Sequence, residues 1–167
     1  TNGITGEVSD LLTSGSASTA LSAVVADDAD VTISVTDSTG TVTAANLSAI
    51  GGSTTGTVTV ANAQTVTGTA AEATAALVTS GTKVVLGGAS TITVSDATAV
   101  ATAATLAGVT NATVGFTSGI TGEVSDLASS GSATSNLSAV VADDADVAIS
   151  VTDSTGTVTA ANLSAIG

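Results

Sequence analysis

The side chains of this chain that could do chemistry are almost all carboxylates and hydroxyls. Its 167 residues include fourteen Asp and Glu and one Lys, and they include no His, Cys or Tyr. Acid-base and nucleophilic catalysis usually employ His, Cys, Lys or Tyr, because the protonation of these groups can be tuned near the working pH. A pair of carboxylates can hydrolyse glycosides, but aromatic side chains that would stack on a sugar are missing apart from one Phe. We therefore expect that the protein is not an enzyme and has no catalytic residues.

The most site-like feature is a cluster of three aspartates that occurs twice. The first set is Asp27, Asp28 and Asp30, and the second is Asp143, Asp144 and Asp146. Closely spaced carboxylates suit a hard divalent cation such as calcium, which binds several oxygen ligands. The motif D-D-x-D lacks the glycine turn and the distal glutamate of an EF-hand loop, and a solvated acidic turn explains the same residues. Both interpretations stay open: these six aspartates are the predicted calcium ligands, and no other cofactor is expected.

Other polar side chains have simpler interpretations. Asp37, Asp96 and Asp153 each follow an expected strand and precede a turn, where Asp commonly bonds its own backbone. Lys83, the single basic residue, is interpreted as a solvated side chain. Outward-facing Thr is ordinary in strands, although ladders of Thr-x-Thr on a flat face also resemble ice-binding arrays. The pattern recurs at Thr41/Thr43, Thr57/Thr59, Thr65/Thr67, Thr91/Thr93 and Thr157/Thr159.

The charge and the composition limit the partners of the protein. A net charge of −13 repels polyanions, so we expect no nucleic acid and no anionic membrane surface as a partner. No apolar run is long enough to span a bilayer, so we expect no membrane insertion. Apolar residues make up 43% of the chain, but aromatic residues make up only 1%. Val, Ile, Leu and Ala without aromatic side chains suit a narrow core, which predicts an elongated molecule.

A long internal repeat is the strongest signal in the sequence. The segment 3–50 recurs as 119–166, with six differences over 48 positions. We therefore expect one long repeat at 1–118, made of about four units that divide near residues 30, 56 and 82. The start of the next copy follows at 119–167, and both ends of the sequence are interpreted as cuts within a longer chain. Units of about 25 to 35 residues are typical of proteins built from stacked repeats.

Each unit follows the same order of local patterns. Alternation of Val and Ile with Thr and Ser, as at 31–35, predicts a strand with one buried face. A turn follows, then a second strand such as Thr41–Thr43, then an Ala-rich stretch such as 44–50 that predicts one or two helical turns. The predicted fold class is therefore mainly β with short Ala-rich helical turns, in a solenoid-like stack of strand-turn-strand-helix units. Tandem immunoglobulin-like β-sandwiches are the alternative architecture.

Two segments carry a resemblance to a known group of proteins. Thr93–Val109 (TVSDATAVATAATLAGV) and Ser34–Ile50 (SVTDSTGTVTAANLSAI) share the pattern V-x-D followed by A-A-x-L. The pattern resembles the repeats of very large secreted bacterial surface proteins, the adhesin-like and haemolysin-type calcium-binding proteins, including those of cyanobacteria. The resemblance implies export, great length, a location at the cell surface or in the matrix, and no catalytic activity. The glycine-rich calcium nonapeptide of haemolysin-type repeats does not occur here, so the resemblance does not extend to calcium binding.

Together these observations predict a secreted structural protein that forms a fibre, sheath, surface layer or adhesin stalk. Its expected partners are copies of itself, in a filament or array, and cell-surface polysaccharide. The main alternative is a calcium-binding adhesive module, in which the acidic loops hold calcium and stiffen or bridge the molecules. A smaller alternative is binding of ice or glycans through the Thr-x-Thr ladders.

Overall fold

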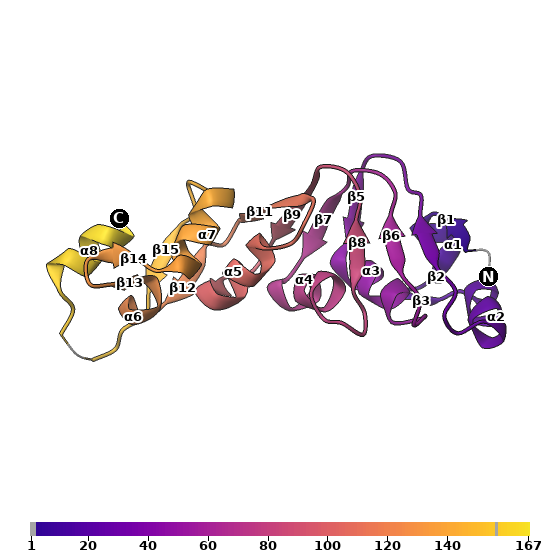
Figure 1. The fold of residues 1–167 in the computed structure, drawn as a ribbon, viewed down its shortest axis with the longest axis horizontal. Coiled ribbons are helices and arrows are strands. Elements are labelled where there is room, and N and C mark those ends of the chain that lie inside the picture. The colour runs from indigo at the N-terminus through magenta and orange to yellow at the C-terminus, as the bar shows by residue number, and fades with distance from the viewer. Residues whose placement is uncertain (1–2, 156) are drawn as a thin grey trace.

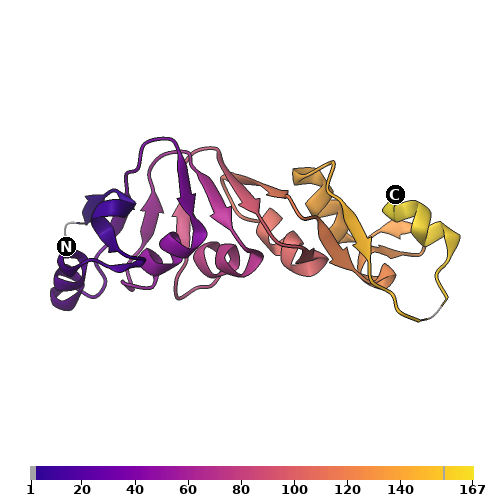
Figure 2. The same ribbon diagram turned by 180° about the vertical axis from the view of Figure 1, so that it is seen from behind.

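The chain folds into an elongated molecule in the computed structural model (Figure 1). The structure describes residues 3–155 and 157–167, so Thr1, Asn2 and Gly156 of the two predicted repeat copies lie outside the described residues. Strands and helices alternate along the chain, and its two ends lie at opposite ends of the long axis (Figures 1 and 2). Sequence position therefore increases along the length of the molecule.

Four strands from successive parts of the chain form one parallel sheet. In spatial order they are β1 (Ile4–Gly6), β4 (Ile33–Val35), β6 (Val58–Val60) and β8 (Val84–Leu86). Their first residues pair directly, so one row of apolar side chains crosses the sheet. The end residues of β4, β6 and β8 are buried, because side chains alternate between the two faces of a strand.

A second parallel sheet lies beside the first, and a third follows it toward the C-terminus. The second contains, in spatial order, β11 (Ala112–Phe116), β9 (Ser90–Val94), β7 (Thr65–Gly68) and β5 (Thr41–Thr43). The third contains β10 (Thr98–Ala99), β12 (Ile120–Gly122) and β15 (Ile149–Val151). Two short antiparallel pairs are β2 (Leu12–Thr13) with β3 (Ser16–Ala17), and β13 (Ala128–Ser129) with β14 (Ser132–Ala133).

Helices occupy the connections between the parallel strands. Parallel neighbours need a crossover connection, and the Ala-rich segments supply it. The helices are α1 (Val8–Leu11), α2 (Thr19–Asp27), α3 (Ala44–Gly51), α4 (Ala70–Leu77), α5 (Val100–Ala107), α6 (Val124–Leu127), α7 (Ser135–Asp143) and α8 (Ala160–Ile166). Thr43 and Thr69 begin α3 and α4, where their hydroxyls accept backbone N–H groups of the first turn. None of the helices in the described part of the chain is long and apolar enough to cross a membrane.

The core is a continuous line of medium-sized apolar side chains between the sheets and the helices. Ala44, Leu47 and Ile50 are all buried on α3, because residues three apart share one face of a helix. Small Ala side chains on α4 and α5 are buried in the same way, and α3, α4 and α5 follow one another along one side of the molecule (Figure 1). Phe116 is the one aromatic residue of the chain and is also buried in this core.

The predicted fold class is wrong. About 35% of the described residues are helical and 27% are in strands, and the two alternate in several parallel sheets, so the chain has an α/β fold and is not a mainly β, solenoid-like stack. The error has a physical cause: helices form not only in the Ala-rich stretches but also at α2 and α7, where no helix was expected, so more residues are helical than are in strands. The alternative of immunoglobulin-like sandwiches is also wrong, because such sandwiches are antiparallel and the larger sheets here are parallel.

Candidate functional site

The aspartates of the predicted calcium sites lie at the ends of two equivalent helices and in the loops that follow. Asp27 is the last residue of α2, and Asp143 is the last residue of α7. Within residues 3–155 and 157–167, no group of three or more His, Cys, Asp or Glu side chains gathers closely enough to hold a metal ion. Calcium binding therefore stays a prediction. A calorimetric titration with calcium tests it, since saturable heat that disappears on Asp28→Asn would support a site.

In the second copy, two carboxylates of this cluster bind the edge of a strand. The N–H of Val114 in β11 donates to Oδ2 of Asp143 at 3.1 Å, and the N–H of Phe116 donates to Oδ2 of Asp144 at 2.7 Å. On its other edge β11 pairs with β9. Unpaired strand edges tend to recruit further strands, so these two carboxylates take the place of a neighbouring strand and end the sheet.

Three further aspartates bind the beginnings of helices. The carboxylates of Asp37, Asp96 and Asp153 accept the N–H of the first residue of α1, α4 and α6, at 2.8, 2.7 and 2.6 Å. A carboxylate stabilises a helix N-terminus by neutralising its free N–H groups and its positive dipole end. The interpretation of these residues as formers of their own turns missed this role, because the partner lies 26 or 29 residues earlier in the chain.

Buried neutral side chains also join consecutive parts of the chain. The hydroxyl of Thr54 donates to the carbonyl of Val31 at 2.8 Å. Nε2 of Gln64 donates to the carbonyls of Asp37 and Ser38, at 2.9 and 2.8 Å. Buried polar groups need such partners, so these side chains fix each loop to the loop one unit earlier. Neither contact could be predicted from the sequence, where only the polar residue type is visible.

One surface of the repeated segment differs in exposure between the first copy, where it lies at the N-terminal end, and the second copy. We call the residues Ile4, Val8, Val24, Asp27 and Asp28 the N-terminal face. Their equivalents in the second copy, 116 positions later, are Ile120, Val124, Val140, Asp143 and Asp144. Val24 is 36% exposed, whereas Val140 is 0% exposed, because α5 packs against α7 and β11 lies beside it. Ile4 and Val8 are half-buried, whereas Ile120 and Val124 are buried, so the apolar residues of this face are less covered in the first copy than in the second.

The C-terminal end shows the opposite arrangement. We call the residues Val151 and Leu163 the C-terminal face, and their equivalents in the first copy are Val35 and Leu47. Leu163 is 49% exposed and Val151 is 41% exposed, whereas Leu47 and Val35 are 0% exposed. In the first copy, β6 pairs with β4 and α4 packs against α3, and this covers the two side chains. Residues 51–118, which lie between the two copies, thus cover Val35 and Leu47 of the first copy and Val140 of the second.

Seven threonines form an array on the second sheet, which we call the threonine array. Direct pairing places Thr41, Thr65, Thr91 and Thr113 in one row and Thr43, Thr67 and Thr93 in another. The hydroxyl of Thr91 donates to the hydroxyl of Thr65 at 3.2 Å. The pair Thr57/Thr59 belongs to the other sheet, at β6. Three of the five predicted Thr-x-Thr pairs are therefore brought together, and Thr157/Thr159 precedes α8 at the far end.

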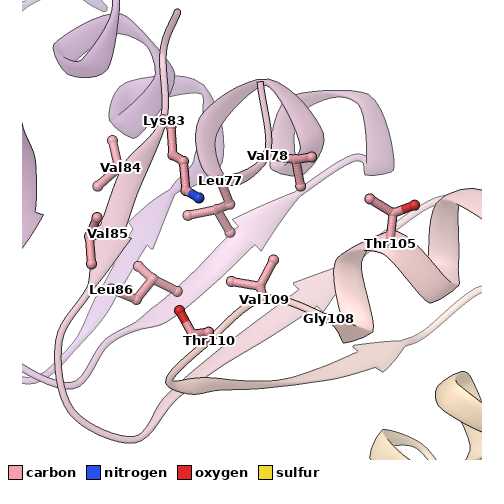
Figure 3. Close-up of a pocket in the computed structure, with 10 residues that line it drawn as sticks. All are labelled: Leu77, Val78, Lys83, Val84, Val85, Leu86, Thr105, Gly108, Val109 and Thr110. Atoms are coloured by element: carbon pink, nitrogen blue, oxygen red, sulfur yellow. The ribbon is translucent and has the colours of Figure 1, made fainter. Parts of the chain in front are cut away.

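A pocket lies between β8 and the end of α5, where the first sheet ends (Figure 3). The apolar side chains of Leu77, Leu86 and Val109 point toward one another there, and Lys83 lies beside them. Lys83 is exposed and is the one ionisable group among the lining residues.

No protein-family model matches the chain, and no curated protein and no solved structure is significantly similar to it.

Proposed function

We propose that this chain is a non-enzymatic extracellular structural protein whose repeats form a fibre, sheath, surface layer or adhesin stalk. One observation carries the proposal: successive strands pair in parallel along the length of the molecule, and the segment between the two copies covers one apolar surface of each. Contacts that repeat from one part of the chain to the next are typical of a protein built from tandem units.

The contacts between units support a structural role. They consist of backbone pairing, apolar packing and side-chain caps such as Asp96 on α4. Each added unit extends the molecule through these contacts and needs no new residue types. The charge of −13 keeps the elongated molecule soluble.

The extracellular location is proposed from the composition and from the resemblance of residues 34–50 and 93–109 to secreted surface repeats. A labelled antibody against the chain tests it on intact cells of the organism that makes the protein. Labelling of the outer surface before any permeabilisation would support the proposal. Labelling that appears only after the cells are opened would contradict it.

Electron microscopy tests the structural role directly. Chains carrying one, two and four copies of the 116-residue repeat should appear as threads of the same width, with lengths that rise in proportion to the number of copies. Constant width is expected because each added segment covers the end face of the one before. Compact particles whose diameter grows with chain length would contradict the proposal.

Binding of ice or glycans is a second candidate function, and the threonine array favours it. Four strands place their Thr side chains in two parallel rows, which gives a regular grid of hydroxyls. If the grid binds ice, the chain should lower the freezing point below the melting point, and Thr41→Lys should reduce this effect. Thr57→Lys is the matched control, because Thr57 is also exposed but lies outside the array.

A further inference from the structure

We infer that the free edge of β8 is a docking site for an extended peptide of a partner protein, in which an acidic residue precedes alternating apolar residues. β8 (Val84–Leu86) pairs with β6, and within the described residues no strand pairs with its other edge. The strand lies in the middle of the chain, with described residues on both sides, so its free edge does not depend on where the sequence begins or ends. The inference goes beyond the proposed function, because it adds a partner to the structural role.

The edge of β8 is free because the chain omits one strand. After α2, α3 and α4 the chain enters the first sheet, at β4, β6 and β8, before it reaches the second sheet. After α5, residues 108–111 lead directly to β11 of the second sheet. The strand that would continue the first sheet beside β8 is therefore missing. The pocket of Figure 3 occupies this place with a volume of about 220 Å³, and all three residues of β8 line it.

The backbone of β8 shows how a strand would bind there. Where β6 continues the sheet from β4, the carbonyl of Val35 accepts the N–H of Ala61 at 2.9 Å. Leu86 is the equivalent of Val35 by direct pairing, and its carbonyl accepts Nδ2 of Asn111 at 2.9 Å. The amide side chain thus takes the place of one N–H of the missing strand. Alternate residues direct their backbone groups to the same edge, so those of Val84 also face this edge, where an incoming strand can pair with them.

The pocket beside this edge suits apolar side chains. Leu77, Leu86 and Val109 point toward one another there (Figure 3). A strand that continues the sheet places two of its side chains beside Val84 and Leu86, since side chains alternate between the faces of a strand. Sites for drug-sized ligands begin at about 300 Å³, so this smaller volume fits two apolar side chains better than a whole organic ligand. The peptide therefore carries apolar residues at two alternate positions.

Lys83 determines the charge of the peptide. It is the only basic residue of the chain, directly precedes β8, and lines the pocket without another ionisable group. The residues that directly precede β4 and β6 are the neutral Thr32 and Thr57. A carboxylate one residue before the first apolar position of the peptide would lie opposite Lys83. All other side chains of the chain are acidic or neutral, so an acidic peptide gains an ion pair at this place alone.

Fluorescence anisotropy tests the inference with the full chain and a fluorescein-labelled peptide of sequence GSEVTVTG. A salt concentration of about 0.15 M limits long-range repulsion to about 8 Å. Binding should be saturable, and the matched peptide GSKVTVTG should bind about two- to fivefold more weakly, as expected for an exposed ion pair. Lys83→Glu should reverse the preference between the two peptides, which a general effect on folding would not do.

Asn111→Gly should strengthen binding. Asn111 has a φ of 64°, which Gly adopts without strain, and the substitution removes the amide that occupies the carbonyl of Leu86. An N–H of the peptide can then bind this carbonyl. The affinity for GSEVTVTG should rise about two- to tenfold, the worth of one hydrogen bond. A misfolded variant would lose affinity instead.

Three results would overturn the inference: no saturable binding of GSEVTVTG, a preference between the peptides that Lys83→Glu leaves unchanged, or an affinity that Asn111→Gly leaves unchanged. Light scattering without any peptide tests a second copy of the chain as the occupant. Association that increases on Asn111→Gly would show that the edge binds another copy, and it would overturn the inference of a different partner. The thread lengths seen by electron microscopy would stand unaffected, because they depend only on contacts within one chain.

Discussion

Leu47 and Leu163 offer a direct measurement of what the intervening segment contributes to stability. The two residues occupy the same position in identical helical sequences, AANLSAI, so helix propensity and local caps cancel in a comparison. Leu47 is fully buried under α4, whereas about half of Leu163 is exposed at the end of the molecule. The change Leu→Ala at each site therefore differs mainly in the burial of the side chain.

The expected magnitudes follow from the exposed fractions. Leu→Ala removes three carbons, worth about 0.8 kcal/mol each when fully buried, so the transfer term is about 2.4 kcal/mol at Leu47. A cavity term of about 1 kcal/mol adds to it, because the surrounding core relaxes only in part. At Leu163 half of the transfer term remains, about 1.2 kcal/mol, and no closed cavity forms. Leu47→Ala should thus cost about 2 kcal/mol more than Leu163→Ala.

Urea unfolding followed by far-ultraviolet circular dichroism measures the two free energies, since the chain lacks Trp and Tyr as fluorescent reporters. Hydrogen exchange of α3 and α8 provides a second reading, because an end helix can open before the rest of the molecule. Equal losses at the two sites would refute the reasoning, as would a loss below about 1 kcal/mol at Leu47.

Three further substitutions test contacts between units. Gly56→Ala should destabilise the protein by about 1 to 3 kcal/mol, because a Cβ there would overlap backbone carbonyls of the preceding unit. Gly81→Ala is the control: its Cβ would meet open space, so the free energy of unfolding should change by less than about 0.5 kcal/mol. Asp96→Ala should cost about 1 kcal/mol, because it removes the acceptor for the N–H of Ala70; no change in the thermal melt would show that water replaces it. Gln64→Leu should cost about 1 to 3 kcal/mol, because two loop carbonyls lose their donor; urea unfolding would contradict this with an unchanged midpoint.

Local patterns identified many elements of the fold but not their extent. The strand expected at Thr41–Thr43 is β5, and the alternation at 31–35 contains β4. The Ala-rich stretch 44–50 forms α3, which is a complete helix of eight residues. Intrinsic propensity predicts a short helix to be marginal, and packing against α4 stabilises it beyond what its own sequence suggests. The fold class was misjudged because α2 and α7 were not expected as helices, and these two add nine residues each.

The roles of the acidic residues could not be read from local sequence. Asp37 and Asp144 each accept an N–H from a residue 28 or 29 positions earlier. These partners become neighbours only when parallel strands of successive units pair. A sequence window around each Asp shows a turn or an acidic cluster, and both descriptions are compatible with calcium binding, with solvation or with capping. The role of each Asp therefore depends on which distant residue the fold brings next to it, and the residue type alone does not show this.

The orientation of the strands determines how the molecule would respond to a pull on its ends. The strands of the first sheet lie across the long axis (Figure 1), and each pairs with a strand 25 to 29 residues away. Tension along the axis would break the backbone hydrogen bonds between one pair of strands and then those of the next pair. The strand pairs would not all be sheared at once. Each opening would release about 90 Å of extended chain at about 3.4 Å per residue. Single-molecule stretching should therefore show a series of small, evenly spaced steps, the behaviour of an extensible tether that absorbs sudden loads.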